Sequence, residues 1–166
     1  LTRRDLLRSG GLLLGASGVS KLALSAQSRY YIDGLSFVPE HDDLIRDSKL
    51  SACIADASKV EIWVDTSGEM RFGRTYQSCL EGLLETRTHI SEVLSNAYVA
   101  RRGSEIGSDG RMGVFLQFQG CEPIEDKLDR IEYFFNQGLR VLQLTHHHNN
   151  LFAGGALEAT PIGLTE

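Results

Sequence analysis

Residues 112–146, MGVFLQFQGCEPIEDKLDRIEYFFNQGLRVLQLTH, decide the fold. The stretch 112–119 is an almost continuous apolar run, which is typical of a strand covered on both faces, as in a parallel sheet. A proline precedes and a glycine follows the segment 124–137, which predicts a helix there. A second apolar run predicts a strand over 139–144. A strand, a helix and a strand in this order indicate a parallel pair joined by a right-handed crossover.

The same alternation extends toward the N-terminus. The segment 29–37 predicts a first strand, 39–49 a short helix and 50–56 a second strand. Leucine and isoleucine at spacings of three and four predict a long helix over 76–98. The chain is therefore of the α/β class, and repeats of this unit form either a doubly wound sheet or a barrel. No glycine-rich phosphate-binding motif is present, which argues against the common nucleotide-binding folds.

The composition is that of one globular domain. The 166 residues carry a net charge of −5, and 42% of them are hydrophobic. A basic face is expected of a nucleic-acid-binding protein, so the acidic balance argues against a nucleic-acid partner. The three cysteines, Cys53, Cys79 and Cys121, match no zinc or redox spacing. We expect them to be buried as small apolar side chains.

The first residues have the pattern of an export signal. The segment 2–8, TRRDLLR, is similar to a twin-arginine signal, and the modestly apolar stretch 10–19 is too short to span a membrane. Small residues at 23–26 suit a signal peptidase. We therefore predict a signal over 1–27, a folded domain over 28–166, and a periplasmic, extracellular or membrane-anchored protein. The alternative is a basic amphipathic helix on a membrane surface.

A run of histidines follows the last predicted strand. His146, His147 and His148 stand at the carboxyl end of 139–144, where parallel α/β folds bind ligands. Imidazoles there can bind metal, hold a substrate or move protons near neutral pH. The alternative is an exposed loop that happens to be rich in histidine.

Three carboxylates also lie near predicted strand ends, namely Asp33, Asp56 and Glu122. Each would face the mouth of a barrel. For Glu122 we favour a structural role, because a carboxylate beside Pro123 would cap the predicted helix and meet its dipole.

The stretch 114–161 resembles the renal (membrane) dipeptidase family, zinc peptidases of the metallo-dependent hydrolase superfamily. In that family an apolar strand ends in Glu-Gly, and a helix is followed by Gly-x-Arg-x-Leu-x-Leu-Thr-His. The matching residues here are Phe-Gln-Gly at 118–120 and GLRVLQLTH at 138–146. The Asp-Gly at 33–34 and the Gly-Leu-Thr at 163–165 match further family motifs. The resemblance implies a (β/α)8 barrel, of which this chain supplies the N-terminal three or four strand–helix units.

The resemblance also implies a function. Family members cleave dipeptides with two zinc ions, so a small peptide substrate and zinc are expected. The retained His146 stands where the family binds substrate. The departures are Leu35 and Phe37, which replace a metal-binding His-x-Asp, and Gln119, which replaces the carboxylate that bridges the metals. Gln119 is thus the expected catalytic position, although a neutral amide is a poor bridge between two cations.

A second His-x-Asp pattern offers a replacement for the missing ligands. His41 and Asp43 lie six residues downstream of the first-strand positions. If the strand were shifted, they would serve as metal ligands. The alternative is that both are solvated residues of an acidic surface segment.

Three functions stay open from the sequence. The first is an exported dipeptidase-like metallohydrolase with an altered first-strand metal site. The second is a non-canonical or metal-free family member that acts as a different hydrolase or as a binding protein. The third is a small exported domain that captures transition metals with His146 and His148, because alternate residues of a strand share one face. The first two readings also allow a homodimer and membrane association through the N-terminal segment.

Overall fold

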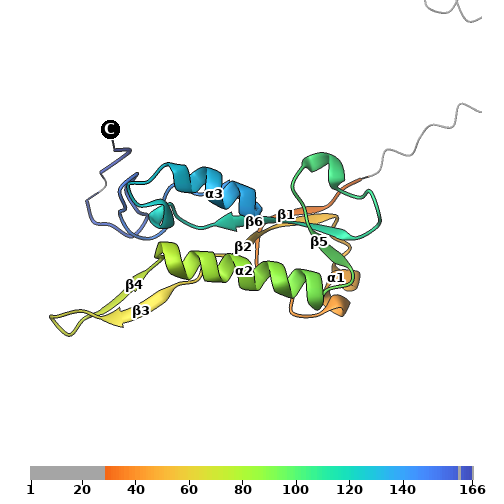
Figure 1. Cartoon of the computed structure of the whole chain (residues 1–166), viewed down its shortest axis with the longest axis horizontal. Coiled ribbons are helices and arrows are strands. Elements are labelled where there is room, and N and C mark those ends of the chain that lie inside the picture. Colours follow the sequence, from red (N-terminus) through yellow and green to blue (C-terminus); the bar gives the residue numbers. More distant parts are fainter. Residues whose placement is uncertain (1–28, 161, 166) are drawn as a thin grey trace, which may run out of the picture.

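A computed structural model describes residues 29–160 and 162–165. The predicted signal over 1–27 lies outside the described residues. The centre is a five-stranded, all-parallel sheet with the order β1–β2–β6–β5, in which β7 also pairs with β6 (Figure 1). Its strands are β1 (Ile32–Ser36), β2 (Ala52–Asp56), β5 (Ala97–Val99), β6 (Met112–Phe118) and β7 (Leu139–Leu142).

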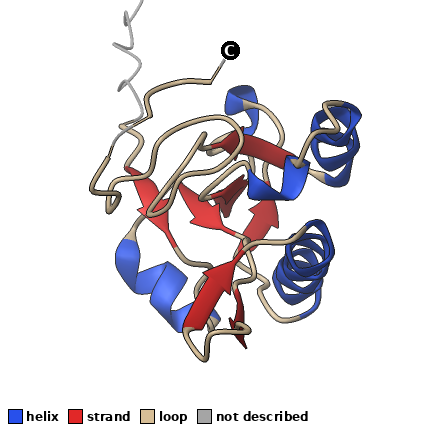
Figure 2. Ribbon diagram, turned by 90° about the vertical axis from the view of Figure 1, so that its left-hand side faces the viewer, coloured by secondary structure: helices blue, strands red, loops and turns tan. Residues whose placement is uncertain are grey.

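The helices pack around the outside of this sheet (Figure 2). They are α1 (Asp42–Ser48), α2 (Tyr76–Glu92), α3 (Asp129–Gln137) and the short 3-10 helices η1 (Gly103–Glu105) and η2 (Glu122–Ile124). The chain between β2 and α2 forms a separate hairpin of β3 (Glu61–Val64) and β4 (Met70–Gly73), which projects from the body of the molecule (Figure 1). β1–α1, β2–α2 and β6–α3 are three strand–helix units, and β7 begins a fourth. The predicted α/β class and parallel sheet are confirmed.

β6 is the central strand, and its two faces differ. Met112, Val114, Leu116 and Phe118 alternate along it and belong to one buried core together with residues of all three α-helices. That core includes Ile45 of α1, Leu83 and Ile90 of α2 and Phe134 of α3. All three helices therefore cover the same face of the sheet, as on the outside of a barrel. Gln117 lies on the other face and is itself buried.

β5 and β7 share one edge of β6. β5 pairs with its first half, Ala97 opposite Met112, whereas β7 begins only at Leu139 opposite Leu116. β2 pairs with the other edge of β6 from Gly113 to Gln117. β1 and β2, joined by α1, lie side by side, and so do β6 and β7, joined by α3, as consecutive units of a (β/α) barrel do. The short strand β5, which follows α2, lies on the opposite side of β6 from β2.

The long helix α2 starts as its sequence suggests but ends early. The Thr75 side chain accepts from the Ser78 backbone N–H at 3.0 Å, and the Ser78 hydroxyl receives the Thr75 N–H in return. The helix ends at Glu92, so the prediction of a helix up to residue 98 is wrong. Apolar residues continue the helical spacing past the end, but there the chain leaves the helix to form β5.

The helix predicted over 124–137 is also shorter than expected. Pro123 lies in the 3-10 turn η2 and starts no α-helix, because Glu125 adopts a positive φ of 54° that stops the helix. α3 begins at Asp129 and ends, as predicted, at Gly138, whose φ is 114°. Its buried residue is Phe134, which packs edge-on against Phe118 with ring centroids 4.9 Å apart. 

The three cysteines are buried and unbridged, as the sequence predicted. Burial raises the pKa of Cys53 and Cys121 to about 11 and that of Cys79 to about 12. Across residues 29–160 and 162–165, no helix has both the length and the apolar character needed to cross a bilayer.

Candidate active site

A cavity of about 500 Å³ lies at the carboxyl edge of the sheet. It is bounded by the hairpin, by the loop after β6 and by the loop after β7. The lining residues are Val60, Phe72, Gly73, Arg74, Gln119, Glu122, His146, His147, His148, Asn149 and Leu157. The predicted site residues Gln119 and His146 thus lie in one cavity. The carboxyl edge is the place where parallel α/β sheets bind ligands.

Three buried polar atoms without a partner converge on this cavity. In the described part of the chain, four buried side-chain nitrogen or oxygen atoms lack a hydrogen bond, and they are Arg74 Nε, Gln117 Nε2, Glu122 Oε2 and His146 Nδ1. All but Gln117 belong to residues that line the cavity. Buried polar groups are normally paired, so a cluster of unpaired ones marks a place prepared for a polar ligand.

His146 is held by the loop that follows β7. Its carbonyl accepts from the Ala156 N–H at 2.8 Å, and its ring stacks on that of His147 with centroids 3.8 Å apart. The side chain is half-buried. Burial lowers the pKa of His146 from its ordinary value of 6.5, and the nearby charges of His147 and Arg74 lower it further. The imidazole is therefore neutral at pH 7 and can donate or accept a hydrogen bond.

The histidine run is not part of a strand. β7 ends at Leu142, so the expectation that alternation brings His146 and His148 together is wrong. Instead the neighbours His146 and His147 stack, and His148 Nδ1 lies 3.2 Å from a carboxylate oxygen of Glu158. The same oxygen accepts from the Asn149 N–H at 3.1 Å.

Glu122 faces the cavity and caps no helix, contrary to the role favoured from the sequence. It is the first residue of η2 and makes no capping hydrogen bond, and α3 starts well beyond it. Its carboxylate folds back over Gly120, where a Cβ atom would overlap it. The missing side chain of Gly120 therefore makes the space in which the carboxylate lies.

Arg74 brings a positive charge to the same wall. It follows β4 directly, and it pairs with no carboxylate among the described residues. Its charge is close enough to His146 to lower the pKa of that histidine. A half-buried guanidinium without a counter-charge is complementary to a carboxylate or another planar anion.

Gln119 is positioned by the end of β2. Its backbone N–H donates to Ser58 Oγ at 3.0 Å, and the Ser58 hydroxyl donates to Asp56. Asp56 Oδ1 also accepts from the Ser58 N–H at 2.9 Å. This network joins the ends of β2 and β6 and fixes the backbone beside the cavity. Asp56 also raises the pKa of His146, although burial outweighs this effect.

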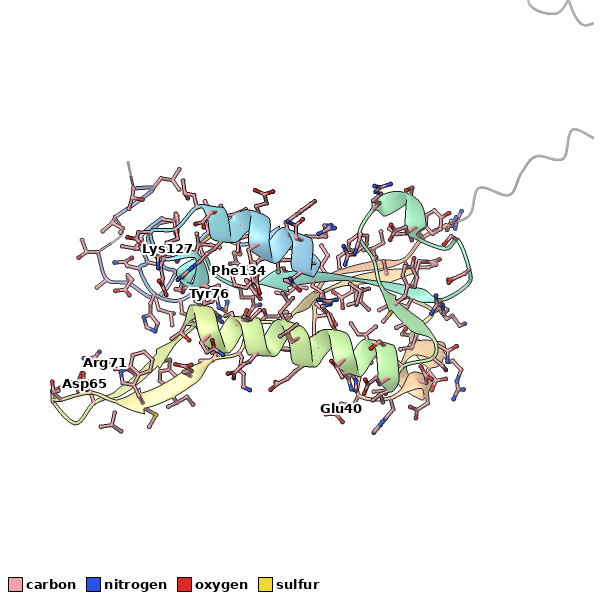
Figure 3. All side chains as sticks on the ribbon, viewed as in Figure 1. Glu40, Asp65, Arg71, Tyr76, Lys127 and Phe134 are labelled. Carbon is pink, nitrogen blue, oxygen red and sulfur yellow. The ribbon has the colours of Figure 1, made fainter. Side chains whose placement is uncertain are left out.

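His41 and Asp43 lie at the opposite edge of the sheet. Between them, Asp42 accepts from the backbone N–H groups of Ser95 and Asn96 at 3.0 and 2.9 Å, just before β5 begins. Figure 3 shows the neighbouring Glu40 beside the C-terminal end of α2, at the far end from the hairpin. The structure therefore does not bring His41 and Asp43 together with Gln119 and His146.

The first-strand positions carry no ligand. Leu35 and Phe37 are 58% and 74% exposed on and just after β1. Within the ranges that the structure describes, no three histidine, cysteine, aspartate or glutamate side chains gather where a metal ion would bind. Asp33 is tied to its own strand and accepts from the Leu35 N–H at 3.1 Å.

Sequence reasoning missed Arg74 and misassigned Glu122. Nothing in the local pattern distinguishes Arg74 from an ordinary surface arginine. Glu122 could have been found from Gly120, because a glycine two residues before a carboxylate at a strand end leaves space for that side chain.

Comparisons with known proteins support the fold. No protein-family model matches the sequence, and no curated protein is detectably similar to it. Among solved structures, the chain is similar to an amidohydrolase from Pseudomonas aeruginosa, with a TM-score of 0.67 and 20% sequence identity. The similarity covers 82% of this chain and 39% of that one, so the chain spans well under half of that structure. This similarity shows the fold, an α/β arrangement with a parallel sheet that is compatible with part of a (β/α) barrel, and the dipeptidase resemblance stays a prediction.

Proposed function

We propose that the cavity binds small peptides and hydrolyses their amide bond, as a dipeptidase-type hydrolase with an altered metal site. The observation that carries this proposal is the convergence of Arg74 Nε, Glu122 Oε2 and His146 Nδ1, all buried and unpaired, on one cavity. Leaving such groups unpaired costs free energy, which a ligand with matching polar groups would recover. The Arg74 cation matches the carboxylate of a short peptide, the neutral His146 imidazole matches its carbonyl, and the Glu122 carboxylate can accept a proton from water. The similar amidohydrolase structure is consistent with this reaction class.

Each side chain has a distinct role in this proposal. Arg74 binds the free carboxylate of the peptide through its guanidinium. The neutral His146 donates a hydrogen bond to the scissile carbonyl oxygen and to the oxyanion that forms from it. Glu122 takes a proton from the attacking water as the new carbon–oxygen bond forms. The same proton then passes to the leaving nitrogen as the carbon–nitrogen bond breaks.

The two zinc ions implied by the family resemblance do not fit the residues in hand. Leu35 and Phe37 have no donor atoms, and Gln119 offers a neutral amide where a bridge between cations needs a charged carboxylate. We therefore derive no step through zinc.

Dipeptide hydrolysis is the direct test. We expect the purified protein to cleave dipeptides such as Ala-Leu, measured by release of free amino acids with and without added zinc. Glu122→Gln and His146→Ala should each lower kcat by about 100-fold or more. His41→Ala is the matched control, because His41 is exposed at the opposite edge, and it should leave kcat unchanged. No cleavage of any dipeptide under either condition would refute the proposal.

A binding protein is the second candidate. The apolar Leu35 and Phe37 and the neutral Gln119 favour it, because they remove the charges that a two-metal hydrolase uses. It predicts saturable peptide binding without turnover. Elemental analysis that found two metal ions per chain would rule this candidate out.

We also propose that the protein works outside the cytoplasm, after twin-arginine export directed by residues 1–27. The support is the Arg3-Arg4 pair ahead of a weakly apolar stretch. Replacing both arginines with lysine should keep the protein in the cytoplasm in a fractionation assay. Unchanged export of this variant would contradict the proposal.

A further inference from the structure

The β3–β4 hairpin carries an entirely apolar face. Its register places Ile62 opposite Phe72 and Val64 opposite Met70. Alternate residues of a strand share a face, so these four side chains form one surface, called here the apolar hairpin face. They are 53% to 67% exposed. Four large apolar side chains side by side in water mark a binding surface more often than an isolated exposed residue does.

The rest of the hairpin holds this face in place. At the turn, Asp65 accepts from the N–H groups of Ser67 and Glu69 at 2.9 and 3.0 Å. The other carboxylate oxygen of Asp65 pairs with Arg71 Nε at 2.7 Å (Figure 3). The Ser67 hydroxyl also donates to Asp65, and this hydrogen bond, followed by the Arg71 contact, holds the pKa of Asp65 well below its ordinary value. The hairpin is therefore closed by its own polar contacts, and its apolar face is preformed.

The apolar hairpin face continues into the candidate active site. Phe72 lines the main cavity together with His146 and Glu122. Phe72 and Met70 also line an adjoining cavity of about 250 Å³, whose remaining wall includes His148. A peptide whose polar groups contact His146 would therefore place a side chain that points toward the hairpin against Phe72 and Met70.

We propose that the apolar hairpin face is the side-chain subsite of this cavity, and that it selects peptides with a large apolar side chain next to the scissile bond. This inference rests on the proposed function, because it assigns a substrate class to the same site. The apolar hairpin face adjoins a cavity that is lined by unpaired polar atoms. The polar atoms would bind the peptide backbone, and the hairpin would bind the side chain. The apolar hairpin face would thus decide which peptides bind.

The only tryptophan of the chain provides a probe of binding that does not need catalysis. Trp63 lies in β3, on the opposite side of the hairpin, over Gly73. Two uncleavable ligands are compared, the Gly-Phe and Gly-Gly analogues in which a methylene replaces the scissile carbonyl. We expect the intact protein to bind the Gly-Phe analogue about tenfold or more tightly, measured by Trp63 fluorescence and by calorimetry.

Two variants and a matched control locate the preference. Phe72→Ala and Met70→Ala should each reduce the preference for the Gly-Phe analogue by about tenfold. Phe135→Ala is the control, because Phe135 on α3 has the same 53% exposure as Phe72 but lies away from the cavity. It should leave both affinities unchanged. Circular dichroism checks that each variant folds.

Other results would overturn the inference. Equal affinity for the two analogues would do so, as would a preference that survives both Phe72→Ala and Met70→Ala. Self-association that disappears in Phe72→Ala would assign the face to a dimer contact instead. If the Gly-Phe analogue binds tightly but Gly-Phe itself is not hydrolysed, the proposed activity is contradicted and the subsite inference stands. Equal kcat/KM for Gly-Gly and Gly-Phe contradicts the subsite and keeps the activity.

Discussion

The carboxylate of Glu122 lies over Gly120, in the space that a Cβ atom at position 120 would need. Gly120→Ala should therefore push the carboxylate out of the cavity while leaving the strand before it intact. Because misplacing a catalytic group by about 1 Å can cost as much as about 100-fold in rate, we expect kcat for dipeptides to fall by about tenfold or more. Steady-state kinetics measures this change.

Gly103→Ala is the control for Gly120→Ala. A Cβ at Gly103 meets no atom within 4 Å, and the residue lies in η1, away from the cavity. This variant should keep the wild-type rate. Equal rates for the wild type and Gly120→Ala would show that the position of Glu122 does not matter for the reaction.

Arg74→Gln tests recognition of the peptide carboxylate. The substitution keeps a polar side chain but removes the charge that lacks a counter-ion in the structure. We expect KM for dipeptides to rise about tenfold or more, since a hydrogen bond between charged groups contributes about 1.5–3 kcal/mol. Dipeptide amides, which have no carboxylate, should show no such rise. The same loss for both substrate classes would assign Arg74 to the fold instead.

Stability near neutral pH depends on His146. Burial lowers its pKa in the folded protein below the value of 6.5 that we take for the unfolded chain. Below pH 6.5 the unfolded chain therefore binds a proton that the folded protein does not. The contribution of His146 to stability is complete above pH 6.5 and decreases as the pH falls toward its folded pKa. Urea unfolding of the wild type and His146→Gln should give free energies of unfolding whose difference is constant above pH 6.5 and shifts against the wild type as the pH falls below 6.5. A difference that stays constant over the whole range would contradict the shift.

The core on the helix side of the sheet depends on Phe134. Its ring is fully buried and lies 4.9 Å from that of Phe118 and 5.5 Å from that of Tyr76. Phe134→Ala should lower the free energy of unfolding by about 3–5 kcal/mol. Phe135→Ala, which removes an exposed ring beside Arg140, should lower it by less than about 1 kcal/mol. Chemical denaturation of both variants decides whether the neighbouring rings differ as described.

The sequence predicted those elements whose local pattern and tertiary environment agree. β6 was found because a run buried on both faces needs no alternation, and the end of α3 was found because Gly138 suits a left-handed cap. The start of α3 was missed because Pro123 is equally suited to a 3-10 turn, and only the positive φ of Glu125 stops the helix there. Whether Pro123 lies in a 3-10 turn or in the first turn of an α-helix depends on the tertiary structure, and the local sequence pattern does not decide it.

The candidate site was predicted only in part, for a related reason. Gln119 and His146 follow strands, so their place at the carboxyl edge follows from the topology. Arg74 and Phe72 come from the hairpin, which the sequence did not indicate, because exposed apolar residues on a two-stranded ribbon resemble buried ones. Distant segments meet in the cavity, and single-sequence periodicity carries no information about such meetings.

The early end of β7 on the edge of β6 that it shares with β5 has an evolutionary consequence. β7 starts opposite Leu116 and ends opposite Phe118, so the chain has passed the last paired residue four positions before His146. His146 is thus held by loop contacts such as its 2.8 Å bond to the Ala156 N–H, and no strand pairing depends on its neighbours. Substitutions, insertions and deletions in this loop can change the chemistry of the cavity while the strand pairing stays intact. Specificity in such a protein is free to diverge faster than its architecture.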